Sequence, residues 1–244
     1  MNKNSMLYWF PKIKELDIPQ PRTIIVDLEA DHWDIMEVIE GGDPEVIESK
    51  MVKIELAVYS LGLPLFMRTA YTSGKHDWLN TCYLTEFRKI RYHILALIED
   101  SALKEIPVDA FVFREYLEMD SKFTAFSGAM PVNPERRYFI KDGEIQCKHH
   151  YWIADAIAEG DEAYARHGMS KLPENWLELL YEMNNETDEE VELLSGYAEQ
   201  VAEVVEGYWS VDFCKAKDGR WILIDMALGE ASWHDERCEY CESY

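Results

Sequence analysis

The sequence is poor in basic residues and has no long apolar segment. Its 244 residues include 24 lysines and arginines against 47 aspartates and glutamates, a formal net charge of −23. Non-specific binding of nucleic acid needs a basic face, so this charge argues against free nucleic acid as a partner. No apolar run approaches the roughly 18 residues of a membrane-spanning helix, and the N-terminus leads into an aromatic patch instead of an apolar signal-peptide core. We therefore expect a soluble globular protein that stays in the cytoplasm and has no membrane partner.

Cysteine is also scarce, and its spacing excludes a disulfide framework. There are five cysteines, an odd number, and we expect reduced thiols. Cys238 and Cys241 form a lone CxxC pair next to His234, and one such pair supplies at most half of a zinc site. His149 and His150 are adjacent on an expected strand, so they point to opposite faces and do not suit one metal. The sequence thus predicts a C-terminal segment without a specific role.

Three familiar catalytic signatures are missing. The Walker A pattern GxxxxGK followed by Ser or Thr is absent. There is no convincing Ser-His-Asp or Cys-His arrangement. The Lys-x-Asp-Gly nucleophile motif of nucleotidyl ligases is absent too, because the Lys-Asp-Gly triplets at 141–143 and 217–219 lack the intervening residue. Any catalysis must therefore work without a side-chain nucleophile.

The pattern of apolar residues predicts an α+β protein. Strands and helices alternate at first, and antiparallel hairpins dominate later, without internal repeats or a long linker. In the helix at 85–103, the residues expected to face a core are Phe87, Ile90, Ile94, Leu95 and Leu97. Expected strands cover 23–26, 64–69, 109–118, 123–130, 136–140 and 145–152, and expected helices cover 45–61, 85–103, 153–167, 175–183 and 188–206, with a short helical turn at 34–39.

The stretch 209–225 organises the rest of the chain. It reads as two apolar strands joined by Lys-Asp-Gly, and Asp-Gly between apolar runs is the strongest short-range hairpin signal. With the turn near Gly219, Asp212 and Asp225 become neighbours on paired strands. Two such carboxylates repel each other unless a cation sits between them, and a hard divalent ion such as Mg²⁺ would serve. A surface hairpin with two solvated aspartates is the alternative.

Two other segments could bind an anion or a base. The strand 64–69 ends at Arg68 and Thr69 and runs into a polar loop that contains Ser73-Gly74-Lys75, and backbone N–H groups with an ammonium favour an anion. An ordinary surface turn is the alternative. The strand 109–118 could offer backbone groups to a base and an acidic side chain to a ribose, or it could be a central strand with Arg114 and Glu115 in ion pairs.

Taken together, these segments resemble an ATP-grasp domain. The likeness is to the small ATP-grasp clade of bacteria and phages and to the related eukaryotic assembly chaperones for a translation initiation factor. It runs from about residue 7 to 232 and is strongest at 64–78, at 111–116 with 135–139, and at 211–213 with 224–225. The resemblance implies two α+β lobes whose antiparallel sheets sandwich the nucleotide. Residues 1–110 would form the N-terminal region and first lobe, and 111–244 the second lobe, with an acidic helical insertion at about 153–206.

The resemblance also implies roles for individual residues. Arg68, where many members have lysine, and Lys75 would touch the phosphates of ATP. Val112 and Phe113 would give backbone contacts to adenine, and Glu115 or Glu118 would bind the ribose.

Three further residues receive roles in catalysis and metal binding. Arg137 would act with Lys75 in catalysis, at the γ-phosphate or the reacting carboxylate. Asp212 and Asp225 would bind Mg²⁺. Many members have Asn two residues after the second acid, where this chain has Ala227, so Glu230 or water would have to replace that ligand.

Two functions follow as expectations. The first is an ATP-dependent carboxylate–amine ligase that forms an acyl phosphate on an amino acid, a peptide or a protein. The second is a non-catalytic ATP-binding assembly factor that holds a protein partner, with the acidic helices at about 153–206 as the partner surface. ATP turnover that depends on a small amine or carboxylate would favour the first, and stable ATP binding without turnover the second.

Overall fold

The chain forms two compact units. The computed structural model describes residues 2–29, 37, 41–43, 45–126, 128–236 and 238–241. The first unit holds residues 5–7 and 21–117, and the second holds residues 2–4, 8–20 and the chain from Glu118 onward. Among the described residues, no helix is both long and apolar enough to cross a membrane. The helical turn expected at 34–39 lies outside the described residues except at Glu37, which is helical.

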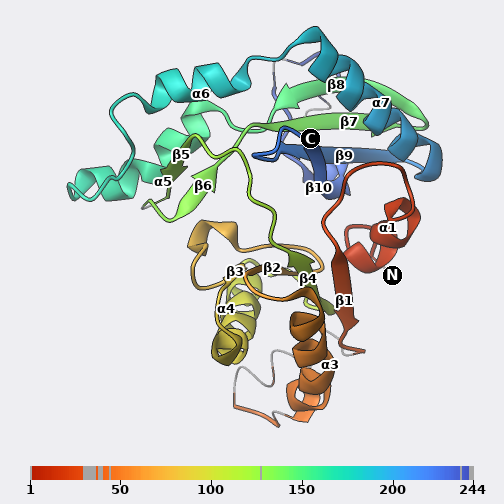
Figure 1. Cartoon of the computed structure of the whole chain (residues 1–244), viewed down its shortest axis with the longest axis vertical. Coiled ribbons are helices and arrows are strands. Elements are labelled where there is room, and N and C mark those ends of the chain that lie inside the picture. The colour runs from red at the N-terminus through yellow and green to blue at the C-terminus, as the bar shows by residue number, and fades with distance from the viewer. Residues whose placement is uncertain are drawn as a thin grey trace. The chain divides into compact units, whose positions relative to one another are not determined.

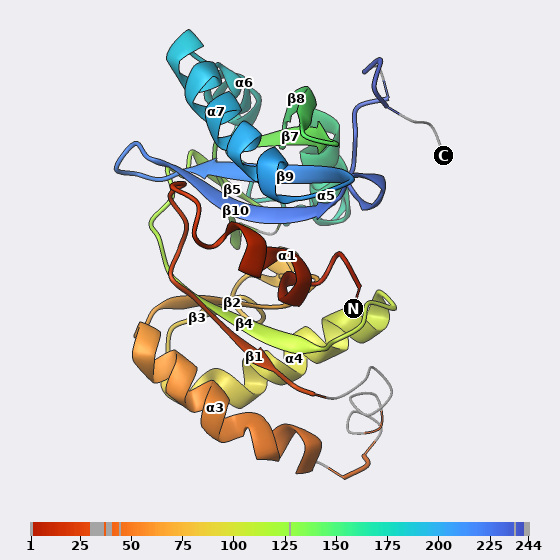
Figure 2. The ribbon, with the colours of Figure 1, turned by 90° about the vertical axis from the view of Figure 1, so that its right-hand side faces the viewer.

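The first unit is a four-stranded antiparallel sheet with helices on one face (Figures 1 and 2). Phe111 and Phe113 of β4 point to the core that these helices close. Because side chains alternate along a strand, Val112 lies on the opposite face, and Arg68, its cross-strand partner, lies beside it. In spatial order the strands are β1 (Thr23–Asp27), β4 (Ala110–Glu115), β2 (Leu65–Thr69) and β3 (Tyr83–Leu84), and the helices are α3 (Glu45–Leu61) and α4 (Ile90–Leu103).

Helix α3 has the predicted bounds, whereas α4 begins later than expected. Gly62 ends α3 with a positive φ of 80°, and its N–H donates to Val58 O at 2.9 Å, as the predicted glycine cap requires. Helix α4 begins at Ile90, after a 3₁₀ turn at Phe87–Lys89. Ile90, Ile94 and Leu97 are buried as predicted, but Phe87 and Leu95 are exposed. Phe87 precedes the helix, and Leu95 lies about 100° around the helix from Ile94, off the buried stripe.

The second unit is built on another four-stranded antiparallel sheet, with α7 over one face (Figure 2). Leu194, Ala198 and Val201 of α7 are buried, and Tyr197 packs its ring on Phe213 of the sheet. In spatial order the strands are β10 (Trp221–Leu228), β9 (Tyr208–Lys215), β7 (Glu135–Lys141) and β8 (Glu144–His150). The helices are α5 (Ala154–Arg166), α6 (Trp176–Asn184) and α7 (Asp188–Val204), and α1 (Met6–Ile13) runs from residues of the first unit into residues of the second.

Local signals explain the turns of this unit. The turn between β7 and β8 places Asp142 and Gly143 at φ values of 50° and 93°, which is why Asp-Gly suits a tight hairpin. Thr187 and Glu190 form the predicted capping box at the start of α7. The single strand expected at 123–130 is wrong. Phe126 and Gly128 have positive φ and turn the chain back, so that β5 (Phe123–Ala125) pairs with β6 (Met130–Val132).

Candidate functional site

A row of four polar side chains crosses the sheet of the second unit. His149 on β8 pairs with Arg137 on β7, Arg137 pairs with Asp212 on β9, and Asp212 pairs with Asp225 on β10. The predicted closeness of Asp212 and Asp225 is confirmed, with a bulge between Leu223 and Asp225. Since Phe213 packs on α7, the alternation of side chains puts this row on the face that α7 does not cover.

The centre of the row is a two-pronged ion pair between Arg137 and Asp212. Arg137 Nε donates to Asp212 Oδ1 at 2.8 Å, and Nη2 donates to Oδ2 at 2.7 Å. The two side chains are only 12% and 7% exposed. Burial alone would lower the pKa of Arg137, but Asp212 offsets it and raises that pKa above the ordinary arginine value. Arg137 therefore supplies part of the positive charge that two neighbouring carboxylates require.

Two further contacts position the guanidinium. Nη1 of Arg137 donates to the carbonyl of Trp233 at 3.2 Å, and the guanidinium lies 4.7 Å from the centre of the Tyr151 ring. Sequence reasoning missed Trp233, because a backbone carbonyl leaves no signal in the residue types. The C-terminal segment therefore contacts the row directly.

The acidic end of the row suits one Mg²⁺ ion. Asp225 is half-buried, and its Oδ1 accepts the N–H of Met226 at 2.9 Å. A carboxylate has about four lone-pair sites, so Asp212 and Asp225 can each keep these bonds and still offer an oxygen to a metal. Mg²⁺ is commonly held by one or two carboxylates, with phosphates and water completing six ligands. The donor set therefore fits the ion that the resemblance implies.

The structure also locates the departure at Ala227. Ala227 lies two residues beyond Asp225 on the same face of β10, opposite Ser210, and its methyl group offers no ligand. The Ser210 hydroxyl hydrogen-bonds to the Ser232 hydroxyl at 2.6 Å. Glu230, in the 3₁₀ turn that follows β10, is exposed. Water or Glu230 would have to complete the coordination here.

Arg136 faces the other side of the sheet from Arg137, as predicted. Its Nη2 donates to the carbonyls of Met183 at 3.0 Å and Asn185 at 3.2 Å, and its Nε lies 3.1 Å from Glu186 Oε1. Burial lowers the pKa of Arg136, and Glu186 opposes that effect. Arg136 thus ties the segment after α6 to the sheet and has a structural role.

In the first unit, Arg68 and Lys75 lie on a strand and on the loop that follows. Arg68 is buried on the helix-free face of the sheet, and its Nε donates to Thr69 O at 3.1 Å. Lys75 begins a 3₁₀ turn after Gly74, which has a φ of 59°. Thr81 Oγ1 donates to Gly74 O at 2.8 Å and so holds the loop in place.

The register does not fit the expected backbone contacts of Val112 and Phe113. β4 has β1 on one side and β2 on the other, and both residues are paired on both sides. Their N–H and C=O groups are therefore committed to the sheet and cannot be offered to adenine. Tyr116 and Leu117 are the first residues beyond β4.

Both expected ribose partners form ion pairs in this structure. Glu115 accepts from Arg22 Nε and from the Arg22 N–H, each at 2.8 Å, so the ion-pair alternative holds for this residue. Glu118 belongs to the second unit, where it pairs with Lys217 at the surface. A ribose would have to compete with these cations.

Comparisons with known proteins agree with this arrangement. A family of ATP-grasp domains, the third family of its clade, matches residues 60–241. Truncated Cdc123 from Schizosaccharomyces pombe has 13% identity and a TM-score of 0.53, covering 92% of this chain and 82% of that one. A second structure of the same yeast protein gives 14% and 0.52, with the same coverage.

A more distant likeness is to D-alanyl-alanine synthetase A from Vibrio cholerae, with 14% identity and a TM-score of 0.46 over 93% of this chain and 56% of that one. No curated protein matches. At such identities the structural likeness is one of fold alone, whereas the family match covers most of the chain. The chain therefore belongs to this clade family of ATP-grasp domains and has the ATP-grasp fold.

Proposed function

We propose that this protein binds ATP with Mg²⁺ and acts as a carboxylate–amine ligase on an amino acid, a peptide or a protein. The observation that supports this most is the row of Arg137, Asp212 and Asp225 on the helix-free face of the second sheet. It combines a fixed cation with two adjacent carboxylates, which is what binding a metal-bound triphosphate needs. Membership of an ATP-grasp family supports the choice of nucleotide.

The proposed reaction has two steps. An oxygen of the substrate carboxylate attacks the γ-phosphorus of ATP, the bond to the β-γ bridging oxygen breaks, and ADP leaves with an acyl phosphate formed. The amine then attacks the acyl carbon, phosphate leaves, the nitrogen loses a proton to solvent, and an amide remains. No side-chain nucleophile is required, in keeping with the missing catalytic motifs.

Each residue of the row has a separate task in this reaction. Arg137 stabilises the negative charge of the transferring phosphoryl group, or orients the carboxylate that attacks it. Asp212 holds the guanidinium in place through its two hydrogen bonds. Together with Asp225, Asp212 would hold Mg²⁺, whose charge offsets that of the phosphates.

An ATP-binding assembly factor is the second candidate. Ala227 removes a metal ligand that many ATP-grasp members have, which would weaken catalysis more than binding. The acidic helices at 153–206 expose large apolar side chains, among them Leu177 and Tyr181 of α6, and a protein partner could cover these.

ATP turnover separates the two candidates. We would incubate the purified protein with ATP, Mg²⁺ and pooled amino acids or short peptides, and measure the release of ADP and phosphate. The ligase proposal predicts release that requires both a carboxylate and an amine, and a product mass equal to their sum less water. Tight ATP binding without turnover in any pool would contradict it and favour the assembly factor.

The role of Arg68 gives a separate prediction. Replacing Arg68 by methionine should weaken the binding of ATP by about 10-fold or more while changing that of adenosine little, because only ATP carries the charge that the guanidinium would meet. Arg68→Lys should keep much of the affinity. Calorimetric titration of both variants with both ligands is the measurement. Equal losses for ATP and adenosine would remove Arg68 from the phosphates.

A further inference from the structure

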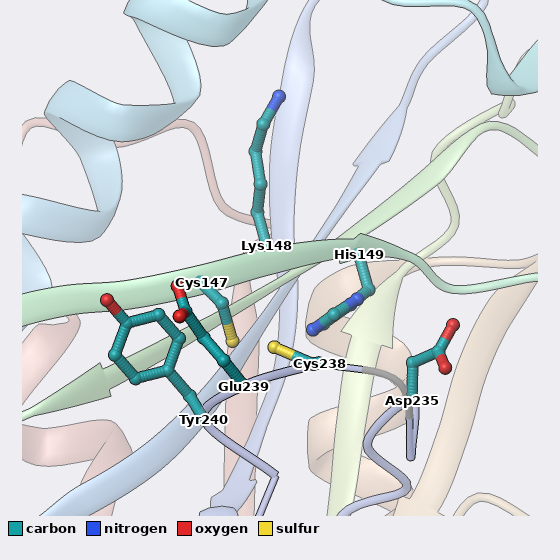
Figure 3. Close-up of a pocket in the computed structure, with 7 residues that line it drawn as sticks. All are labelled: Cys147, Lys148, His149, Asp235, Cys238, Glu239 and Tyr240. Carbon is teal, nitrogen blue, oxygen red and sulfur yellow. The ribbon is translucent and has the colours of Figure 1, made fainter.

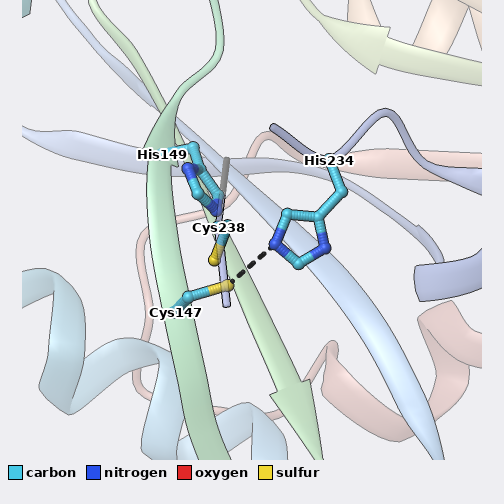
Figure 4. A group of neighbouring side chains, drawn as sticks. All are labelled: Cys147, His149, His234 and Cys238. Carbon is cyan, nitrogen blue, oxygen red and sulfur yellow. Dashed lines mark hydrogen bonds between the residues drawn. The ribbon is translucent and has the colours of Figure 1, made fainter. Parts of the chain in front are cut away.

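Four metal-ligating side chains meet at one end of the polar row. Cys147 and His149 come from β8, and His234 and Cys238 come from the C-terminal segment. Their four ligand atoms all lie within 4.8 Å of one another. Figure 4 shows the side chains pointing toward a common centre. The sequence analysis treated the two segments separately and expected no role for the second.

The distances are close to those of a tetrahedral zinc site. With Zn–S bonds of about 2.3 Å and Zn–N bonds of about 2.0 Å, tetrahedral ligand atoms lie roughly 3.3–3.8 Å apart. Cys147 Sγ is already 3.2 Å from His234 Nε2. Small side-chain movements therefore suffice to accept an ion. Two thiolates and two imidazoles are also the ligand set that selects Zn²⁺ over Mg²⁺, which prefers oxygen.

The surroundings orient both histidines as metal ligands. The Tyr208 hydroxyl hydrogen-bonds to His234 Nδ1 at 3.0 Å, which leaves Nε2 directed at Cys147. The His234 ring stacks on Phe139 with 4.0 Å between ring centres, so its plane is fixed. His149 Nε2 is buried and has no hydrogen-bond partner among the described residues. A buried ring nitrogen without a partner is costly, and a metal ion would satisfy it.

The protonation of these groups is compatible with metal binding. Burial lowers the pKa values of His149 and His234, so both imidazoles are neutral at pH 7, as ligands must be. Burial, with the neighbouring Cys238 thiol, raises the pKa of Cys147 to about 12. The free thiol thus keeps its proton, which zinc would displace on binding.

We propose that Cys147, His149, His234 and Cys238 bind one structural Zn²⁺ ion. Four protein ligands leave no open position, which is typical of structural and not catalytic zinc. The ion would fasten the C-terminal segment to β8. It would also hold the carbonyl of Trp233, next to His234, against Arg137, at the centre of the row (3.2 Å).

A surface pocket beside the cluster gives an ion a route to it. The pocket has a volume of about 460 Å³, and Cys147, His149 and Cys238 line it (Figure 3). Asp235 and Glu239 also lie at this pocket, where their carboxylates would attract a cation from solvent. The cluster can therefore be loaded without unfolding.

The test is the metal content of the full chain, purified without chelators and measured by plasma mass spectrometry. We expect about one zinc per chain in the unmodified protein and a loss of most of it in Cys147→Ser and His149→Asn. Two matched controls should keep the zinc. Cys241→Ser removes a thiol of the same segment, and His150→Asn removes the neighbouring imidazole on the opposite face.

A second measurement on the unmodified protein covers the case in which a variant fails to fold. Removing the zinc with a chelator and adding Co²⁺ should give the intense visible absorption of a tetrahedral thiolate site. A metal-free protein that gives no such spectrum would overturn the proposal, as would a disulfide between Cys147 and Cys238 or equal losses in the controls. ATP takes no part in these measurements, so they are independent of the ligase proposal.

Discussion

Replacing Arg136 by methionine is expected to lower the free energy of unfolding by roughly 3–5 kcal/mol, the usual cost of breaking a buried ion pair from one side. The guanidinium donates to the carbonyls of Met183 and Asn185 and lies against Glu186, and its side chain is only 2% exposed. Methionine fills much of the space but donates nothing. Two buried carbonyls and one carboxylate would lose their partner together.

Lys148→Met is the matched control, because Lys148 meets the same carboxylate, at 2.8 Å, from the more exposed side. Its side chain is 34% exposed, so its loss should cost about 1 kcal/mol or less. Urea denaturation followed by tryptophan fluorescence measures both variants. If Arg136→Met unfolds at the same urea concentration as Lys148→Met, Arg136 is not the anchor that the structure indicates.

Replacing Asp225 by asparagine is expected to weaken the binding of ATP in the presence of Mg²⁺ by roughly 100-fold, the upper end of the loss that even a supporting residue of a metal site causes. Asparagine keeps the size of the side chain and can still accept from the Met226 N–H, so the fold should survive. The lost charge also reduces the repulsion of free ATP. The variant should therefore bind ATP weakly and almost equally with and without Mg²⁺.

The turn of the same hairpin provides the control for this variant. Asp218 is exposed and pairs with Arg220, at the far end of the strands from the row. Asp218→Asn should bind ATP with Mg²⁺ as the unmodified protein does, in calorimetric titration and with an unchanged unfolding midpoint for both variants. A loss in Asp218→Asn as large as that in Asp225→Asn would mean that general charge, and not a metal site, determines the affinity.

Much of the fold follows from signals that lie close together in the sequence. The Asp-Gly turns determine both long hairpins of the second unit, and with them the pairing of Asp212 with Asp225. The capping box at Thr187 and the glycine after Leu61 mark helix ends that the structure confirms. In each case the residues that decide the conformation are within a few positions of it.

What the sequence could not provide depends on distant partners. A strand at 109–118 is readable, but only the order of the strands shows that β4 is central and that Val112 and Phe113 have no free backbone groups. Helix α1 was not expected, because it contains Pro11, a residue that usually ends helices. Packing decides in both places, and a local pattern does not record it.

The candidate zinc site shows the same limit. The spacing of Cys147 and His149 puts both on one face of a strand, so half of the ligand set was readable. The other half arrives from His234 and Cys238, and only the folded C-terminal segment brings it there. His149 also belongs to the row across the sheet, which only the register of four strands reveals.

The most direct test of the Mg²⁺–ATP site is a calorimetric titration of the unmodified protein with ATP, once with Mg²⁺ and once with the metal removed by a chelator that spares zinc. If Asp212 and Asp225 hold Mg²⁺ beside Arg137, ATP binds in the first titration and at least about 10-fold more weakly in the second. Equal binding in both would contradict the metal assignment. Absence of binding in both would show that this ATP-grasp domain does not bind the nucleotide.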